Sequence, residues 1–206
     1  MTPPGKIPFS PFDIDEINRL IQQRRSVFTR DFSDEVVDKN AIEQILENAH
    51  WAPNHGKTEP WGFVVMTGSA LEKFGLAHAE MYKEHTAPEA FSEEKYAKLA
   101  KRPTECSHMI AICMKRGANP KIPAVEEIGA VACAVQNMYL TTCALGLGGY
   151  WSSGGMTYHP AMKQLFNLGE EDMCLGFFLI GKPKNSEYYP KGYRKAKWED
   201  KVVWMG

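Results

Sequence analysis

The chain has 206 residues, of which 44% are hydrophobic and 24% charged, and its formal net charge is −1 at pH 7. This composition is typical of a globular protein, and the length predicts one domain over residues 1–206. The near-zero charge argues against binding to nucleic acid or to an anionic membrane. The N-terminus lacks the basic-then-apolar order of a secretory signal, and no apolar run approaches the roughly 20 residues of a membrane span. We therefore expect a cytoplasmic protein.

In the first half of the chain, helical and strand patterns alternate after a proline-rich arm over about residues 1–12. Asp13 is the expected cap of the first helix, and Ser69 with Glu72 forms the S-x-x-E pattern of a capping box for a later one. The predicted elements are a helix from Ile14 to the RRS triplet at 24–26, helices over 38–50, about 69–85 and 92–102, and strands over 61–68 and 107–115.

The second half contains the longest predicted helix, which begins after Pro123 and leads to a glycine-rich turn at 146–149. The first half of this helix is small or apolar around its whole circumference, which is typical of a helix covered on several sides, within one subunit or across a dimer interface. The later predictions are a short extended piece at 149–153, a short helix at 159–167, a buried strand at 173–181 and a basic, aromatic tail over about 182–206 whose end is extended.

Several predicted strands are nearly continuous apolar runs, a pattern of strands covered on both faces. Since they alternate with helices, the sequence predicts an α/β-type sandwich with helices on each side of a sheet.

The five cysteines are isolated and form no C-x-x-C pair. Cys113, Cys133 and Cys174 lie in apolar segments, where we expect buried, reduced thiols. His78 and His85 lie two helical turns apart without a third ligand nearby, so we expect a solvated pair and no metal site.

Three motifs partly match known binding or catalytic patterns, and we reject each of them. GLGGYW at 146–151 lacks the last glycine of a dinucleotide fingerprint and follows a helix instead of a strand. GFFLIGKP at 176–183 has proline where a phosphate-binding loop needs Ser or Thr. Glu126 and Glu127 are a candidate general base, but at a helix start they more simply complement the helix dipole.

Three polar clusters lie at the ends of predicted elements: RRS at 24–26, HWAPNHGKTEPW at 50–61 and GLGGYWSSGG at 146–155. The arginines either satisfy carbonyls at the helix end or, with the serine, grip a phosphate. The middle cluster holds too many aromatic groups for a surface loop and too many polar groups for a core element. The third either forms a tight turn with a core tryptophan or exposes backbone N–H groups beside an aromatic wall. Together they match the needs of a flavin mononucleotide, FMN.

The chain resembles the FMN-dependent nitroreductase family, and within it the compact branch of NAD(P)H nitroreductases. The resemblance rests on RRS, on A-P-N-H-G-x-x-E-P-W-x-F-V-V from Ala52, on the small-residue helix leading to G-L-G-G-x-W, and on G-K-P at 181–183. It covers about residues 15–206. It implies an α+β fold with a central mixed sheet flanked by helices, in an intertwined homodimer with FMN at the subunit interface.

The resemblance also implies the site. Phosphate and the flavin edge would be bound by residues near the N-terminus, the same flavin would be approached by residues of the other subunit, and the ring would be lined by residues after the glycine-rich turn. No side chain would be catalytic, because the chemistry occurs at flavin N5, which a backbone N–H near Ser153 or Gly154 would face. The residues that would bind the phosphate and the flavin edge are Arg24, Arg25 and Ser26, with Arg194 or Lys195 of the tail completing the phosphate site. Those that would approach from the other subunit are Trp51, Asn54 and His55. Those that would line the ring are Trp151, Ser152 and Ser153.

The sequence departs from the family pattern at three positions, where Trp51, Lys57 and Glu59 stand in place of the family's frequent arginine, asparagine and glutamine. A tryptophan can cover a ring but cannot make a charged contact. A lysine near the pyrimidine would favour anionic reduced flavin, so we expect Lys57→Met to make the reduction potential more negative.

The resemblance implies an oxidoreductase that passes hydride from NAD(P)H to FMN and then to nitroaromatics, quinones or similar electron-poor acceptors, in a ping-pong sequence. Three alternatives are a reductive dehalogenase-like flavoenzyme with region 83–105 as its lid, a non-catalytic FMN-binding protein or redox sensor, and an interaction protein without a cofactor.

Overall fold

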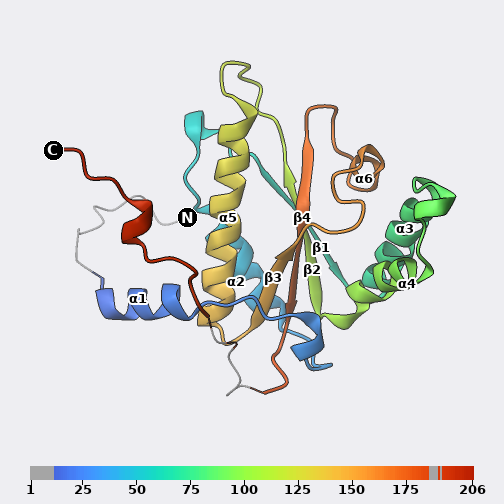
Figure 1. The fold of residues 1–206 in the computed structure, drawn as a ribbon, viewed down its shortest axis with the longest axis horizontal. Coiled ribbons are helices and arrows are strands. Elements are labelled where there is room, and N and C mark those ends of the chain that lie inside the picture. The colour runs from blue at the N-terminus through green and yellow to red at the C-terminus, as the bar shows by residue number, and fades with distance from the viewer. Residues whose placement is uncertain (1–11, 186–189, 191) are drawn as a thin grey trace.

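The computed structural model describes residues 12–185, 190 and 192–206 and shows a four-stranded sheet between two groups of helices (Figure 1). The predicted N-terminal arm falls almost wholly on residues 1–11, outside the described residues. The strands are β1 (Trp61–Thr67), β2 (His108–Met114), β3 (Gly148–Ser152) and β4 (Met173–Gly181). The helices are α1 (Ile14–Gln23), α2 (Lys39–His50), α3 (Ser69–Glu84), α4 (Glu93–Lys101), α5 (Ala124–Ala144) and α6 (Pro160–Leu165).

The sheet has the strand order β1-β2-β4-β3, and each pairing among the described strands is antiparallel. The expected mixed sheet is therefore corrected for the single chain. Apolar runs show that both faces of a strand are covered, but they carry no information on the direction of its neighbours. β1 and β3 are the edges of this sheet.

The central strands alternate between two cores. In β2, Ile110 and Ile112 pack with α2 and α5, whereas Met109 and Ala111 pack with α3 and α6 on the other face. This two-residue period follows from the strand geometry, in which successive side chains point to opposite faces. Every residue of β2 is buried, which confirms the predicted sandwich.

Helix starts follow the sequence signals with one exception. Asp13 caps α1 by accepting the N–H groups of Asp15 and Glu16, as predicted. The predicted capping box of Ser69 and Glu72 is wrong: Gly68, with φ +54°, turns the chain from β1 straight into α3. Ser69 is thus already helical, and no side chain caps the N-terminus of α3.

Two helices leave apolar faces uncovered. No residue of α1 is buried, and its Ile14 and Ile21 are exposed. Along α5, Val125, Gly129 and Cys133 form an exposed stripe at helical spacing. The predicted burial of Cys133 is therefore wrong for the single chain, because the described neighbours of α5 cover only part of its circumference.

The other cysteines in apolar segments are buried, as predicted. Burial raises the pKa of Cys113 to about 12 and that of Cys174 to about 11, so both thiols stay protonated at neutral pH.

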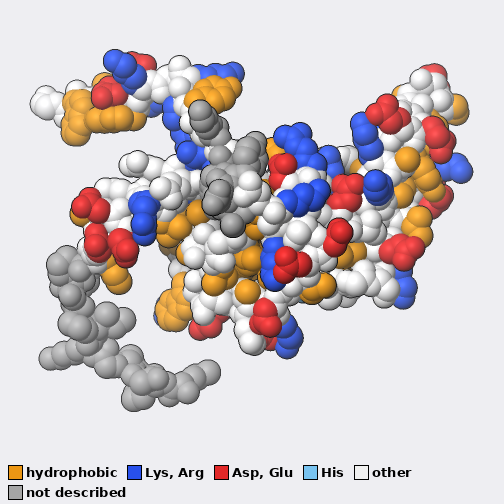
Figure 2. All heavy atoms as spheres, turned by 90° about the horizontal axis from the view of Figure 1, so that it is seen from below, with side chains coloured by type: hydrophobic (Ala, Val, Ile, Leu, Met, Phe, Trp, Pro, Cys, Tyr) orange, Lys and Arg blue, Asp and Glu red, His pale blue; other side chains and the backbone are white. Residues whose placement is uncertain are grey.

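The C-terminal tail leaves the body of the protein (Figures 1 and 2). It makes one 3₁₀ turn at Glu199–Lys201, and the chain then extends with Val203, Trp204 and Met205 at least 85% exposed. Within the part of the chain that the structure describes, no helix has both the length and the apolar character needed to cross a bilayer.

Candidate functional site

Residues from three elements meet at the side chain of Tyr139 on α5. Arg24 is the residue that ends α1, and its guanidinium carbon lies 4.8 Å from the centre of the Tyr139 ring. The hydroxyls of Ser26 and Tyr139 are 3.4 Å apart, and the Tyr139 oxygen accepts the backbone N–H of Trp151 at 2.7 Å. The structure thus brings together two of the predicted clusters, RRS and the segment after the glycine-rich turn.

Tyr139 itself was not predicted as a site residue. It lies in the polar end of an otherwise apolar helix, and its ring packs edge-on against Phe178 of β4 at 4.8 Å. A hydroxyl that lies on the edge of the core needs a hydrogen-bond partner, but the sequence gives no spacing that identifies which partner. The contact between α1, α5 and β3 is set by tertiary packing alone.

The side chain of Arg25 makes its hydrogen bonds to backbone carbonyls. Its guanidinium donates to the carbonyls of Gln22, Arg24 and Pro190, at 2.5, 2.8 and 3.1 Å. It therefore satisfies carbonyls at the end of α1 and ties the start of the tail to that helix. Of the two interpretations of the RRS triplet, Arg25 supports the structural one, whereas Arg24 and Ser26 leave the phosphate grip open.

The indole of Trp151 is turned onto β4. Its Nε1 donates to the carbonyl of Leu175 at 2.9 Å, and a Cβ at Gly176, where φ is +131°, would lie 2.5 Å from that nitrogen. The indole is half-buried and packs against the core. Trp151 therefore fixes the end of β3 against β4.

Ser153 and Gly154, which follow Ser152 at the end of β3, are exposed. Within the described residues, their backbone N–H groups have no hydrogen-bond acceptor. A Cβ built on Gly154 would have only the Ser152 hydroxyl oxygen, at 4.0 Å, within reach. The turn thus carries two adjacent exposed donors that are unused among the described residues, an arrangement suited to an acceptor atom of a ligand.

The remaining cluster, HWAPNH, lies at the end of α2. Trp51 is 79% exposed. Asn54 accepts the backbone N–H of Glu59 at 3.2 Å, and the His55 Nδ1 atom is 2.5 Å from the carboxylate of Glu126 at the start of α5. Trp51 and His55 therefore face outward from a loop that is closed from within by the Asn54 side chain.

The backbone of this loop is wound tightly. Gly56, Lys57 and Glu59 have φ values of +61°, +56° and +44°. Two of the three are not glycine, and such conformations cost free energy that the surrounding contacts must offset. A Cβ at Gly56 would lie 2.8 Å from Ile122, so the loop packs against the segment before α5.

Glu127 is a structural group. It is 1% exposed, it pairs with the guanidinium of Arg116, and it accepts the backbone N–H of Gly117 at 2.9 Å. Arg116 also donates to the carbonyl of Ile122 at 3.1 Å. This fully paired carboxylate braces the loop between β2 and α5, a structural role that the helix-dipole interpretation of the Glu126–Glu127 pair did not include.

The clusters lie toward opposite ends of α5. His55 contacts Glu126 in the first turn, whereas Arg24, Ser26 and Trp151 gather at Tyr139. At about 1.5 Å per residue, Glu126 and Tyr139 are separated by about 20 Å along the helix axis. Within one chain, the structure does not bring the HWAPNH cluster to the other two.

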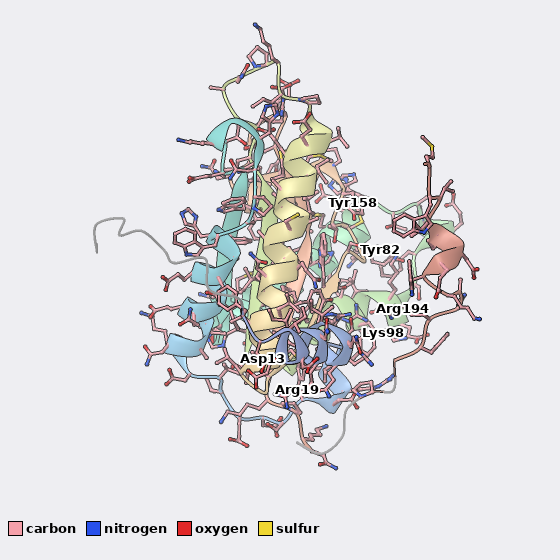
Figure 3. The ribbon with its side chains drawn as sticks, turned by 90° about the vertical axis from the view of Figure 1, so that its left-hand side faces the viewer. Asp13, Arg19, Tyr82, Lys98, Tyr158 and Arg194 are labelled. Carbon is pink, nitrogen blue, oxygen red and sulfur yellow. The ribbon has the colours of Figure 1, made fainter. Side chains whose placement is uncertain are left out.

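Arg194 lies on the exposed tail, where its guanidinium contacts the carbonyl of Tyr193 at 3.4 Å. Lys195 is exposed beside it. Figure 3 shows α1, with Asp13 and Arg19, crossing the end of α5 that carries Tyr139, and Arg194 on the separate tail. In the single chain, neither tail residue is placed at Tyr139 by a contact among the described residues.

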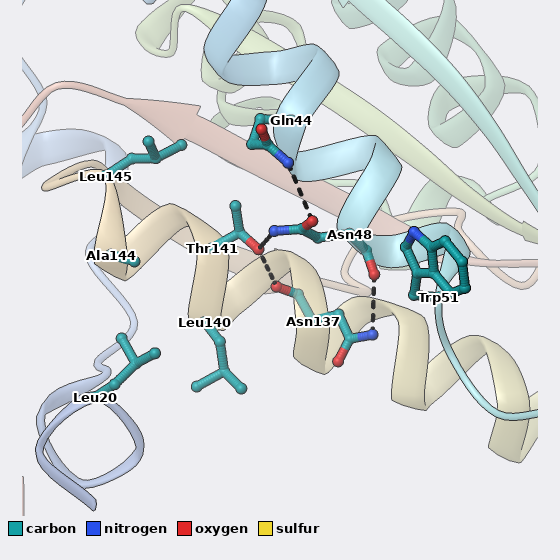
Figure 4. Close-up of a pocket in the computed structure, with 9 residues that line it drawn as sticks. All are labelled: Leu20, Gln44, Asn48, Trp51, Asn137, Leu140, Thr141, Ala144 and Leu145. Atoms are coloured by element: carbon teal, nitrogen blue, oxygen red, sulfur yellow. Dashed lines mark hydrogen bonds between the residues drawn. The ribbon is translucent and has the colours of Figure 1, made fainter. Parts of the chain in front are cut away.

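A cavity of about 530 Å³ lies between α1, α2 and α5 and is lined by both polar and apolar side chains (Figure 4). On its floor, Asn48 donates to the Thr141 hydroxyl at 2.9 Å, and Asn137 donates to the Asn48 carbonyl at 3.0 Å. Trp51 and Leu20 also line it, so this cavity extends from the HWAPNH cluster toward α1.

Comparisons with known proteins agree with this architecture. The family model described as "Nitroreductase family" matches residues 21–182. "Putative NAD(P)H nitroreductase YdjA" of Escherichia coli K12 is 31% identical over 144 residues, which cover 69% of this chain and 76% of that protein. A nitroreductase-like family protein from Bacillus cereus superposes with a TM-score of 0.76 at 26% identity, over 95% of this chain and 98% of that one.

A more distant structure has the same fold. The FMN-dependent nitroreductase NfnB of Mycobacterium smegmatis, solved in complex with NADPH, superposes with a TM-score of 0.70 at 16% identity, over 94% of this chain and 100% of that one. The family model spans most of the chain, including the RRS, HWAPNH and YWSSGG clusters. The chain therefore belongs to the nitroreductase family.

Proposed function

We propose that this protein is an FMN-dependent NAD(P)H oxidoreductase that works as a homodimer with FMN at the subunit interface. The observation that carries the proposal is the pair of unused backbone donors at Ser153 and Gly154 beside the cluster at Tyr139. Family membership and the FMN-dependent, NADPH-bound relative support it.

The residues present fit FMN. Arg24 offers a permanent positive charge and Ser26 a short hydroxyl, the donors that a phosphate monoester needs. Ser153 and Gly154 offer N–H donors for a ring nitrogen, with open space at Gly154 for close approach. Tyr139 contacts Arg24 and Ser26 and accepts the N–H of Trp151, two residues before Ser153, so we expect one ligand to engage both sets of donors.

Three uncovered apolar surfaces support a second copy of the chain. They are the face of α1, the stripe on α5 and the end of the tail, which together expose Ile14, Ile21, Val125, Val203 and Trp204. The edge strand β1 exposes Val64 and Val65 as well, and an unpaired apolar edge favours association with another chain. Burying such surfaces is the main driving force of association, at roughly 25 cal/mol per Å².

A two-fold axis that sets the α5 helices of two copies antiparallel would place the Glu126 end of one beside the Tyr139 end of the other. The exposed stripe of Val125, Gly129 and Cys133 includes two small residues, Gly129 and Cys133, so two helices that pack along it can bring their backbones close together. Each site would then combine Arg24, Ser26 and the amides of one chain with Trp51, Asn54 and His55 of the other.

When bound, FMN would supply two-electron redox chemistry, first with NAD(P)H and then with an acceptor that enters after the nicotinamide has left. The chain's residues bind and orient: Arg24 and Ser26 hold the phosphate, and the amides of Ser153 and Gly154 hold the reactive edge of the ring. No side-chain acid is required, since Ser153 and Gly154 are exposed and solvent can deliver protons there. Nitroaromatics, quinones and similar planar, electron-poor compounds are the acceptors that we propose.

The absorption spectrum of the purified protein tests this proposal, followed by anaerobic addition of NADPH and then of a nitroaromatic or a quinone. We expect a flavin spectrum that bleaches with NADPH and returns with the acceptor. Bound flavin that NAD(P)H does not reduce would instead identify a non-catalytic flavoprotein. A colourless protein that does not take up added FMN would overturn the proposal.

Two variants locate the site. Arg24→Gln removes the proposed phosphate partner, and we expect the FMN dissociation constant to rise at least tenfold. Arg19→Gln is the matched control, because Arg19 is exposed on the same helix and pairs, among the described residues, with Glu16 at 3.5 Å. Equal FMN affinity in both variants would remove Arg24 from the site.

A further inference from the structure

His78 is a buried ionisable group that the proposed reaction does not use. It lies on α3, is 4% exposed, and packs between the rings of Phe74 and Phe177, with centroid distances of 5.4 and 5.9 Å. A buried polar group needs a partner, and this imidazole has one: its Nε2 accepts the backbone N–H of Met156 at 2.9 Å. Met156 lies in the turn that follows Ser153 and Gly154.

The backbone of the turn packs directly against the imidazole of His78. Gly155 has φ +70°, and a Cβ there would lie 2.5 Å from the His78 Nε2 atom and 2.8 Å from Leu99 of α4. The adjacent Thr157, 1% exposed, donates its hydroxyl to the carbonyl of Gly154 at 2.7 Å. The turn is therefore held from α3, from α4 and from within itself.

The hydrogen bond to Met156 fixes the state of the imidazole. Because Nε2 accepts, it carries no proton, and the hydrogen of the neutral ring is on Nδ1. Burial, helped by the positive charges of Arg102 and Lys95, lowers the pKa of His78 to about 4. The acceptor is thus available throughout the neutral range.

We propose that His78 is a positioning residue for the flavin: by holding Met156, it sets the direction in which the amides of Ser153 and Gly154 point. The inference rests on the proposed function, which gives those amides their ligand. The turn has an upstream anchor where the N–H of Trp151 donates to Tyr139, and His78 supplies the downstream anchor. Donors held at both ends are preorganised, so binding does not have to order them.

The arrangement also links this turn to the α3–α4 pair. Both His78 and Leu99 contact Gly155, and they come from the two helices that flank the turn on one side. A shift of either helix would therefore change the orientation of the donors. Among the described residues, His78 supplies the hydrogen bond from α3 to the turn.

Three variants test the role. His78→Phe keeps an aromatic ring between Phe74 and Phe177 but removes the acceptor. His78→Leu also removes the acceptor and serves if the larger phenylalanine ring does not fit. His78→Gln places an amide oxygen near the former Nε2 position and should restore the bond in part. His85→Phe is the control, since His85 directly follows α3 and its ring contacts that of His159 at 4.3 Å, whereas the N–H of Met156 donates to His78.

The first measurement uses the protein freed of FMN and follows hydrogen exchange of the Met156 amide. We expect at least tenfold faster exchange in His78→Phe, partial recovery in His78→Gln and no change in His85→Phe. Unchanged exchange in His78→Phe and His78→Leu would overturn the inference.

The second measurement is the midpoint potential of bound FMN. Flavin N5 accepts a hydrogen bond when oxidised but carries a hydrogen when reduced, so a well-aimed N–H stabilises the oxidised form. We expect His78→Phe to shift the potential to more positive values and His78→Gln to return it toward wild type. Faster exchange with an unchanged potential would make His78 a packing residue and overturn only this inference. Wild-type protein that binds no FMN would overturn the proposed function and, with it, this role.

Discussion

A single oxygen atom on α5 joins two segments that are far apart in the sequence. The Tyr139 hydroxyl accepts the N–H of Trp151 and lies 3.4 Å from the Ser26 hydroxyl, while the ring beneath it supports the Arg24 guanidinium. The ring and the hydroxyl thus have separable roles, one in packing and one in hydrogen bonding. A substitution that removes only the hydroxyl can distinguish them.

Tyr139→Phe keeps the ring contact with Phe178 and leaves the N–H of Trp151 without its acceptor. A lost hydrogen bond of this kind costs about 1 kcal/mol, so we expect FMN affinity, measured by fluorescence titration, to fall about fivefold. Tyr158→Phe, at a residue 66% exposed, is the control and should bind FMN as wild type does. A Tyr139→Phe variant with unaltered affinity would exclude the hydroxyl from the site.

The buried His78 also makes stability depend on pH. In the unfolded chain its imidazole titrates at the ordinary 6.5, whereas the folded pKa is about 4, so below pH 6.5 the unfolded state binds the proton first. The stabilisation is complete above pH 6.5 and is lost as the pH falls toward 4, by about 3 kcal/mol in all. Burial lowers the pKa of His108 in the same direction.

Urea unfolding of wild type and His78→Phe between pH 7 and pH 4 measures this contribution. We expect the variant to lose less stability than wild type over the interval, with a residual slope from His108 and from the carboxylates. Parallel curves for the two proteins would show that His78 is protonated equally in both states.

At this scale, the sequence predicted the residue types of the site better than their contacts. Arg24, Ser26 and Trp151 stood out because their types match a phosphate and a flat ring. Tyr139 and His78 did not: His78 was expected to be solvated but is 4% exposed, and the role of each residue becomes clear only once its hydrogen-bond partner is known. Those partners, Trp151 and Met156, are brought close only by the packing of α5 and α3 on the sheet.

Among the elements, α3 and α4 touch most closely at a glycine. A Cβ at Gly75 would lie 2.2 Å from the backbone carbonyl oxygen of Ala100, so the two helices meet with no room for a side chain. Since a carbonyl in a helix cannot move independently, any larger residue must push α4 away. Leu99, which packs on the turn at Gly155, would move with it.

Gly75→Ala should therefore lower the melting temperature, although replacing glycine by alanine inside a helix ordinarily stabilises it by roughly 0.5–1 kcal/mol. Overpacking costs about 1–3 kcal/mol, which outweighs that gain. We also expect faster hydrogen exchange at Met156, because Leu99 retreats from the turn. A raised melting temperature in thermal unfolding would show that the α3–α4 contact is looser than the structure indicates.

Element boundaries could be predicted closely wherever the period and a stop signal agreed. The strand at 173–181 matches β4, and Asp13 caps α1 as its side chain suggested. The capping box failed because Gly68 supplies a positive φ that turns the strand directly into α3, so no side-chain cap is needed. The mixed sheet, which the family resemblance implied, is not seen among the strand pairings described within the single chain, all of which are antiparallel.

For the molecule as a whole, a charge introduced into the exposed stripe on α5 distinguishes a monomer from a dimer. Gly129→Glu places a charge where a Cβ meets no atom of the same chain within 4 Å, so a lone chain should tolerate it. In the proposed dimer the same charge would be buried without a partner, and we expect dimer affinity to fall at least tenfold, with loss of FMN. Analytical ultracentrifugation gives the measurement. Leu76→Glu, at an exposed apolar position on α3, is the control.

The dimer could not be derived from the pattern of α5 alone. Small residues at Gly129, Ala130 and Ala134 fit a buried helix equally well within one subunit or between two. The structure reduces this ambiguity, because Ala130 and Ala134 are buried in the chain while Gly129 and Cys133 remain uncovered.

The HWAPNH cluster and the residues gathered at Tyr139 lie toward opposite ends of α5, and this separation has a genetic consequence. If each site draws Arg24 from one chain and Asn54 from the other, then a homodimer of Arg24→Gln chains has two damaged sites, and so has a homodimer of Asn54→Ala chains. A mixed dimer collects both defects in one site and leaves the other intact. Co-expression of the two defective genes should therefore restore activity that neither restores alone, with one flavin bound tightly per mixed pair.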